Sequence, residues 1–280
     1  MSASILSRGW IGTQRGHIRY LAAGAALFSI CTGGAGYAPR FPGFTGGFMA
    51  IYTIGDLHLS LGADKAMDIF PGWENYVARI EENWKNTVRE EDTVVLAGDI
   101  SWGMSLQQAL RDFQFIDALP GKKLLLKGNH DYWWTTRAKM EAFFEENGIR
   151  SLSFLHNSAS LVEGLWLCGS RGWIFENGQE HDRKITAREA TRLEHSLKSA
   201  EGDQGERVAF LHYPPLYGNE TSAEILDVLR RYEVRRCYYG HIHSAGCAWA
   251  LEGEHLGITF KLISADYLRF CPHLVPLSGK

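Results

Sequence analysis

The stretch TVVLAGDI, residues 93–100, decides the fold that this chain can adopt. A run of apolar and β-branched residues ends there in the turn Gly98-Asp99, which is the pattern of a buried strand that carries a carboxylate at its end. The same pattern occurs upstream in IYTIGDLH, residues 51–58, and downstream in KKLLLKGNHD, residues 122–131. Each apolar run predicts a strand, and each turn after it supplies Asp, Asn or His.

Two later stretches repeat this arrangement. They are VAFLH, residues 208–212, and RCYYGHIH, residues 236–243. In open α/β sheets the loops after the carboxyl ends of the strands form the binding crevice. The five predicted strand ends are therefore expected to bring their polar side chains to one place.

The residue types in these turns are those that bind divalent metals. Mn, Fe and Zn accept carboxylate or amide oxygen and imidazole nitrogen. A single turn of this kind is an ordinary loop signal, because Gly, Asn and Asp tolerate the left-handed backbone of tight turns. Five turns with their polar residues confined to strand ends indicate a site instead. Two ions roughly 3.5 to 4 Å apart need an anionic bridge, and Asp99 is central in the series.

In this arrangement the chain resembles the calcineurin-like metallophosphoesterases. The pattern of that family is D-x-H, GD, GNH[DE], H and GHxH, and all five blocks are present between Asp56 and His243. A closer resemblance is to the bacterial predicted phosphohydrolases of the same superfamily, through GSRGW at residues 169–173 and HYPP at residues 212–215.

The resemblance implies a centre of two divalent metal ions, with Mn as the favoured metal and Fe, Zn, Co and Ni as alternatives. It assigns three ligands to each ion and one bridging carboxylate. The first ion would be held by Asp56, His58 and His243, the second by Asn129, His212 and His241, and the bridge would be Asp99. A hydroxide between the ions would attack phosphorus directly, so no protein nucleophile is needed.

Three further residues are candidates for catalysis or substrate binding. His130 is not a ligand in the family pattern and would protonate the leaving oxygen or stabilise the phosphoryl group. Asp131 either orients the His130 ring or caps the next helix, since Asp is a favoured N-cap. Arg171 either grips a phosphate with its planar fork of donors or is an ordinary surface Arg.

These residues predict a metallophosphoesterase that acts on a small phosphate ester. A phosphomonoesterase and a phosphodiesterase would share every metal ligand, so the substrate is left open. One alternative is a non-catalytic scaffold that uses the phosphoesterase fold to bind proteins, and another is a metal-dependent nuclease. The segment 59–70, which contains Lys65, is expected to lie over the pocket and to influence the choice of substrate.

Composition favours a cytoplasmic enzyme. The chain has 280 residues, 45% hydrophobic residues and a net charge of −3, which is enough for one large domain. Its five cysteines form no C-x-x-C pair and are odd in number, as suits a reducing compartment. Without the four arginines of residues 1–48 the remaining net charge falls from −3 to −7, which argues against general nucleic-acid binding.

Residues 1–48 differ from the domain expected at 49–280. They contain four Arg but no Lys, Asp or Glu. Three interpretations compete: a secretory signal, a transmembrane anchor, or a translation start assigned too early. Met49 opens directly into the first predicted strand, which favours the third interpretation, and no stable membrane anchor is expected because the apolar run is interrupted by Thr32 and two glycines.

The remaining pattern predicts an α/β domain. Strands are expected at residues 51–54, 93–97 and 122–126, helices at residues 73–89, 105–119, 135–146 and 186–200, and a late hairpin formed by residues 245–251 and 257–264. Alternating strands and helices followed by antiparallel strands suit the four-layer α-β-β-α sandwich of the resembled family, in which helices flank two mixed sheets. One open, doubly wound sheet is the alternative.

Overall fold

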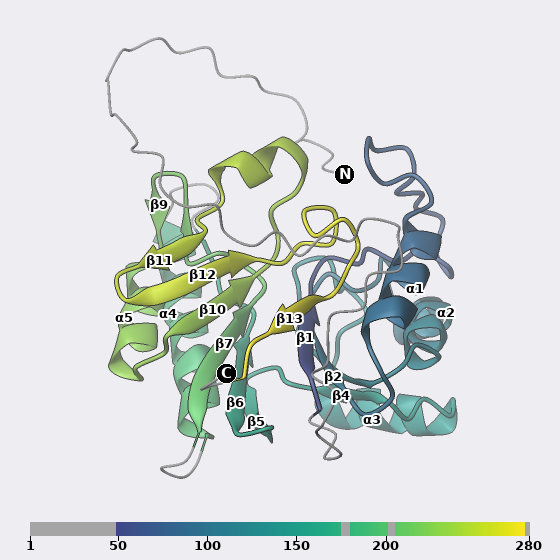
Figure 1. Cartoon of the computed structure of the whole chain (residues 1–280), viewed down its shortest axis with the longest axis horizontal. Coiled ribbons are helices and arrows are strands. Elements are labelled where there is room, and N and C mark those ends of the chain that lie inside the picture. Colours follow the sequence, from purple (N-terminus) through teal and green to yellow (C-terminus); the bar gives the residue numbers. More distant parts are fainter. Residues whose placement is uncertain (1–48, 175–179, 201–204, 278–280) are drawn as a thin grey trace, which may run out of the picture. The chain divides into compact units, whose positions relative to one another are not determined.

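A computed structural model describes residues 49–174, 180–200 and 205–277, so the predictions for residues 1–48 lie outside the described residues. The first sheet has five strands (Figure 1), and the first residues of β1, β2 and β3 pair with one another. Only its edge strand β13 runs antiparallel. In spatial order the strands are β13 (His273–Val275), β1 (Ile51–Ile54), β2 (Thr93–Leu96), β3 (Lys122–Leu125) and β4 (Leu152–Phe154).

The second sheet has six strands with a parallel centre and one antiparallel strand at each edge. In spatial order these are β11 (Gly253–His255), β12 (Ile258–Leu262), β10 (Arg236–Tyr239), β7 (Glu206–Leu211), β6 (Leu165–Ser170) and β5 (Ser158–Val162). A short two-stranded ribbon, β8 (Leu216–Tyr217) with β9 (Glu220–Thr221), follows β7 in the chain.

Helices cover the outer face of each sheet (Figure 1). The first sheet carries α1 (Tyr76–Thr87), α2 (Leu106–Asp117) and α3 (Arg137–Glu146), and the second carries α4 (Glu180–Lys198) and α5 (Ala223–Arg231). Helix α1 buries Tyr76, Ile80 and Trp84, which are spaced four residues apart and therefore share one face. Helix α2 begins after Ser105, whose side chain accepts a hydrogen bond from the backbone N–H of Gln108.

The apolar strand runs are continuous because both faces of each sheet are buried. On β2, Val94 packs into the core beneath the first layer of helices, whereas Val95 packs into a core between the sheets. That inter-sheet core also contains Leu124 from the first sheet and Val208 and Phe210 from the second. The two sheets therefore pack face to face, which confirms the four-layer sandwich and excludes the single open sheet.

One predicted strand near the C-terminus is wrong, and with it the predicted pairing of the hairpin. Residues 245–251 were expected to form a strand, but Ser244–Trp249 form a 3-10 helix. The hairpin partner of β12 is β11, and the turn lies at Leu256 and Gly257, which have φ values of 54° and 76°. A two-residue turn with two positive φ angles matches the right-handed twist of the flanking strands. Helix α5 and the edge strand β13 were not predicted.

None of the helices in the described ranges combines the length and the apolar character needed to cross a membrane.

Candidate metal centre

The loops after five parallel strands carry the predicted ligands, and these loops meet at one edge of the sandwich. Gly55 follows β1 and joins the second sheet, because its backbone N–H donates to the carbonyl of Ile263 at 2.7 Å. The predicted ligands are Asp56 and His58 after β1, Asp99 after β2, Asn129 after β3, His212 after β7, and His241 and His243 after β10. The seven positions are thus placed where the strand pattern predicted.

Two glycines are required for the loops to approach this closely. A Cβ atom at Gly128 would run into the carboxylate of Asp99, and a Cβ atom at Gly240 would run into the carboxylate of Asp56. Both Asp residues have left-handed backbones, with φ values of 58° at Asp56 and 50° at Asp99. Such conformations are uncommon outside glycine and tend to occur at functional sites.

Asp56, His58 and His243 form the first group of potential ligands. One ligand atom from each lies within 4.8 Å of the others. The Nε2 atoms of His58 and His243 are 3.3 Å apart, and Nε2 of His243 is 3.5 Å from Oδ1 of Asp56. These nitrogen and oxygen donors fit a borderline divalent ion.

A second group surrounds the side-chain oxygen of Asn129. Oδ1 of Asn129 lies 2.6 Å from Nε2 of His212 and 3.0 Å from Nδ1 of His241. His212 also contributes to a potential metal-binding group with Asp56 and Asp99.

Asp99 lies between the two groups. Its Oδ2 atom is 3.7 Å from Nε2 of His58, and its Oδ1 atom is 3.6 Å from Nε2 of His212. One carboxylate thus presents one oxygen to each group, as a bridging ligand must.

In His212 and His243, a hydrogen bond to Nδ1 orients the ring so that Nε2 points toward the candidate ligands. Nδ1 of His212 lies 3.1 Å from the carbonyl of Ala97, so this nitrogen donates and Nε2 is free to bind metal. Nδ1 of His243 contacts Oδ1 of Asp266 at 2.9 Å, which leaves its Nε2 atom toward Asp56. Such outer contacts fix the tautomer and orientation of a metal-binding ring.

Burial and crowding shift the proton affinities at the centre. Burial lowers the pKa of His58 and of His241 well below the ordinary value, so these rings offer lone pairs. Burial and the neighbouring charge of Asp56 raise the pKa of Asp99 well above its usual range. For His243, burial lowers the pKa, but the Asp56 carboxylate and the Asp266 hydrogen bond outweigh it and raise the pKa to about 10. The neutral rings of His58 and His241 beside the crowded carboxylates of Asp56 and Asp99 are a donor set that a cation would satisfy, and a bound cation would replace the proton of His243.

His130 lies beside the ligands without joining either group. Its backbone N–H donates to Oδ1 of Asp99 at 2.8 Å, and its ring packs on Trp102 with centroids 4.5 Å apart. Nδ1 of the ring contacts the hydroxyl of Tyr132 at 3.2 Å. Burial and the charges of His212 and Lys65 lower the pKa of His130 to about 4. The ring is therefore neutral near pH 7 and acts there through hydrogen bonds.

Asp131 does not have either of the roles expected for it. Its buried carboxylate accepts hydrogen bonds from the backbone N–H groups of Asp99 and Ile100, both at 2.9 Å, and of Gly128 at 2.7 Å. It also accepts one from Nε1 of Trp133 at 3.0 Å. The residue that precedes helix α3 is Thr136, so Asp131 is not its N-cap. The carboxylate joins the loops after β2 and β3 and thereby positions the bridging residue.

Arg171 lies next to the centre but outside the two ligand groups. Its guanidinium contacts the buried carboxylate of Glu189 at 3.0 Å. Its backbone carbonyl accepts hydrogen bonds from the N–H groups of His212 at 3.1 Å and Tyr213 at 2.9 Å. Arg171 is thus neither an isolated surface residue nor a side chain directed at the candidate metal ligands.

Sequence reasoning missed Asp266, which holds His243. Oδ2 of Asp266 also accepts a hydrogen bond from the backbone N–H of Ser244 at 2.9 Å. A signal was present, because Asp266 follows Ser264 and Ala265 just after the parallel strand β12. It is a further strand end with a carboxylate, like those that identified the ligands.

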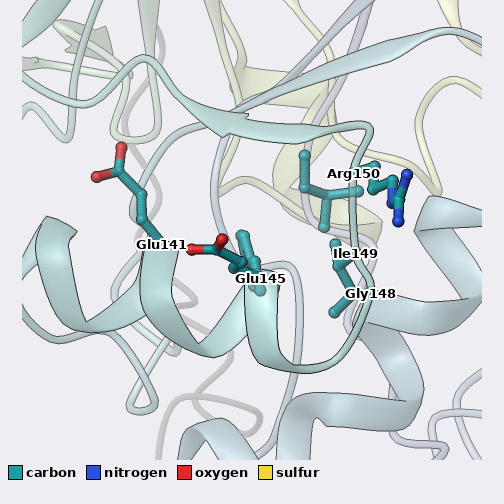
Figure 2. Close-up of a pocket in the computed structure, with 7 residues that line it drawn as sticks. Glu141, Glu145, Gly148, Ile149 and Arg150 are labelled. Atoms are coloured by element: carbon teal, nitrogen blue, oxygen red, sulfur yellow. The ribbon is translucent and has the colours of Figure 1, made fainter.

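A separate hollow of about 410 Å³ lies away from this edge (Figure 2). It is lined by the C-terminal half of α3 and by the connection to the start of β4, including Glu141, Glu145 and Arg150. The candidate ligands follow the carboxyl ends of the strands, whereas this hollow adjoins the amino end of β4. It contains none of the predicted site residues.

Comparison with known proteins gave one family match. A family model described as calcineurin-like phosphoesterase matches residues 49–245, more than half of the chain. A solved protein of unknown function from Aquifex aeolicus has 15% identity and a TM-score of 0.46, over 81% of this chain and 95% of that chain. The protein TT1561 of Thermus thermophilus has 9% identity and a TM-score of 0.47, over 70% of this chain and 83% of that chain. No curated protein matched.

Proposed function

Because the chain belongs to the calcineurin-like phosphoesterase family, we propose that it hydrolyses phosphoric esters at a centre of two divalent metal ions. The position of Asp99 supports this proposal most directly. Its two carboxylate oxygens face His58 and His212, which belong to different ligand groups, at 3.7 and 3.6 Å. A shared anion between two cations is what a two-metal phosphoesterase requires.

The proposed ligands follow from these contacts. Asp56, His58 and His243 would hold one ion, Asn129, His212 and His241 the other, and Asp99 both. Divalent ions held there would lower the pKa of bound water toward neutrality and offset the charge of the phosphoryl group.

His130 is proposed to contact the substrate. Its Nδ1 atom faces Tyr132, which leaves Nε2 as the nitrogen for a phosphoryl or leaving-group oxygen. A neutral ring can donate one hydrogen bond, and a bound phosphate dianion would raise its pKa and favour proton donation. Asp131 is proposed to support this reaction only indirectly, because its carboxylate fixes the backbone of Asp99.

The test is hydrolysis of bis-p-nitrophenyl phosphate and of p-nitrophenyl phosphate by the full chain, after chelation and after Mn²⁺ is added back. Turnover should require metal and should be lost in Asp99→Asn. The preferred ester distinguishes a diesterase from a monoesterase. Two metal ions per chain without turnover of either ester would contradict the proposed activity and favour the scaffold alternative.

A further inference from the structure

Three basic side chains follow β3, which carries the candidate ligand Asn129, and the strands β4 and β6. Lys127 follows β3, His156 follows β4 and Arg171 follows β6. His156 forms a bridge with Gly169 of β6, so the ends of β4 and β6 meet. The carbonyl of Arg171 accepts a hydrogen bond from the backbone N–H of His212. The three basic residues therefore lie next to the candidate metal centre, on the side of the ligands Asn129, His212 and His241.

Helix α4 adds one carboxylate and one cation to the group. Glu189 is fully buried and contacts both Arg171, at 3.0 Å, and Arg192, at 2.5 Å. The side chains of Arg171 and Arg192 retain 17% and 40% of their exposure, so a dissolved ligand can reach them. Together with Lys127, which interacts with the carboxylates of Asp131 and Glu189, the group has three cations and two carboxylates and keeps a net charge of plus one.

Two buried nitrogen atoms in this group have no hydrogen-bond partner in the described part of the chain. They are Nε of Arg171 and Nδ1 of His156, and one buried acceptor of the group, Oε2 of Glu189, also has no partner there. Lys127 and His156 follow the paired strands β3 and β4, and burial together with the charges of Arg192, Lys127 and Arg171 lowers the pKa of His156 to about 3. A buried polar atom without a partner is costly, and an acceptor-rich ligand would satisfy it.

From this geometry we propose that Lys127, Arg171 and Arg192 form a subsite for a second phosphoryl group of the substrate. The proposal rests on the proposed function and narrows it. The substrate would be a phosphate ester that carries another phosphoryl group, held beside Asn129 and His212 while the ester lies at the metal centre. Arg forks and Lys ammonium groups bind phosphate oxygens through charge-assisted hydrogen bonds.

The main alternative to a phosphate subsite is an ion network that only stabilises the fold. In such a network the positive and negative charges would cancel, which they do not in this group. One buried carboxylate compensates one guanidinium, and among the described residues of this group no further carboxylate compensates the second. Lys127 adds a third positive charge, and the carboxylate of Asp131 interacts with it as well as that of Glu189. A cation without a matching carboxylate at the edge of a candidate active site favours an anionic ligand over a network that only stabilises the fold.

Calorimetric titration of the full chain with inorganic phosphate tests this subsite. With metal removed by chelation, the wild type should still bind one phosphate. Lys127→Gln and Arg192→Gln should each weaken binding about tenfold, because a charge-assisted phosphate contact is lost. Lys139→Gln removes an exposed charge on α3 and should change binding less than twofold. Melting temperatures of the chelated proteins establish that each variant is folded.

Either of two outcomes would overturn the proposal. One is folded, chelated wild-type protein that binds no phosphate, and the other is an equal loss of binding in all three variants, which would mean that only overall charge matters. The titration is independent of ester hydrolysis, since it is done without metal. Failure of the proposed phosphoesterase activity therefore leaves this result interpretable, and failure of phosphate binding leaves the proposed activity intact.

Discussion

The side chains at the candidate centre fall into three classes. The first would bind metal, the second would contact the substrate, and the third orients side chains of the first two. His130 belongs to the second class, because its backbone contacts Asp99 while its ring lies outside both ligand groups. His130→Ala should therefore lower kcat by about 100-fold or more, as loss of a group that assists proton transfer does. Metal content, measured by elemental analysis, should remain two ions per chain. An empty metal site in this variant would show that His130 is a ligand.

Asp266 belongs to the third class. Its hydrogen bond at 2.9 Å leaves Nε2 of His243 toward the first ligand group. Asp266→Ala should weaken Mn²⁺ binding by about 10- to 100-fold, the usual cost of losing an outer partner of a metal ligand. Asp227→Ala is the control, because Asp227 is exposed on α5. Equal Mn²⁺ affinity of the wild type and Asp266→Ala would show that Asp266 does not orient the ligand.

At the scale of elements, the connection from β1 to α1 reaches the candidate metal centre through Lys65. Nζ of Lys65 is 3.0 Å from the ring centroid of Trp102, and that ring stacks on His58 with centroids 4.8 Å apart. Burial lowers the pKa of Lys65, and the carboxylate of Asp99 offsets part of this effect. The ammonium group is therefore close enough to the centre to meet the charge of a substrate.

Lys65→Ala should raise KM for a phosphate monoester more than for a diester, because a monoester carries the extra negative charge that the ammonium group would meet. A rise of about tenfold for p-nitrophenyl phosphate against about twofold for bis-p-nitrophenyl phosphate is expected. Lys139→Ala, which removes an exposed lysine elsewhere, should change neither value. Equal rises for both esters would exclude Lys65 from the choice of substrate.

Strands and helices were predicted correctly from the sequence where the local pattern was compatible with only one type of secondary structure. The runs after which Asp56, Asp99 and His212 occur are buried on both faces, and only a buried strand explains such runs in this context. Prediction from the sequence failed where tertiary packing decided the secondary structure of a segment. The apolar residues of Ser244–Trp249 are compatible with a strand, yet this segment follows the loop that carries His243 and coils into a 3-10 helix.

Contacts between distant loops could not be predicted from local patterns. Asp131 was expected to act on its neighbour His130, but its carboxylate contacts the backbone after β2, about thirty residues earlier in the chain. Arg171 was expected either to grip a phosphate or to be an ordinary surface Arg, whereas its guanidinium contacts Glu189 of α4, which also contacts Arg192. Strand ends predict which residues gather at an edge, but not which of them contact one another.

At the scale of the whole molecule, the free energy of unfolding should depend on pH, because the folded sandwich buries the ring of His156 near the edge that carries the candidate site. Folding lowers the pKa of His156 to about 3, from an ordinary value of 6.5, because burial and nearby cations disfavour its charged form. Above about pH 6.5 the ring is neutral in both states and does not affect stability. As the pH falls from 6.5 toward 3, the unfolded chain takes up a proton that the folded protein does not, so stability is lost.

The free energy of unfolding should therefore fall on acidification, and His156→Gln should reduce that fall. From about pH 7.5 to about pH 5.5 the difference between wild type and variant should be about 1 kcal/mol. Urea unfolding in phosphate-free buffer measures it, since phosphate would bind the proposed subsite. His195→Gln is the matched control, because His195 is exposed on α4 and solvated in both states. If His156→Gln and His195→Gln had the same pH dependence as the wild type, His156 would not be the buried, neutral ring that the packing of β4 against β6 implies.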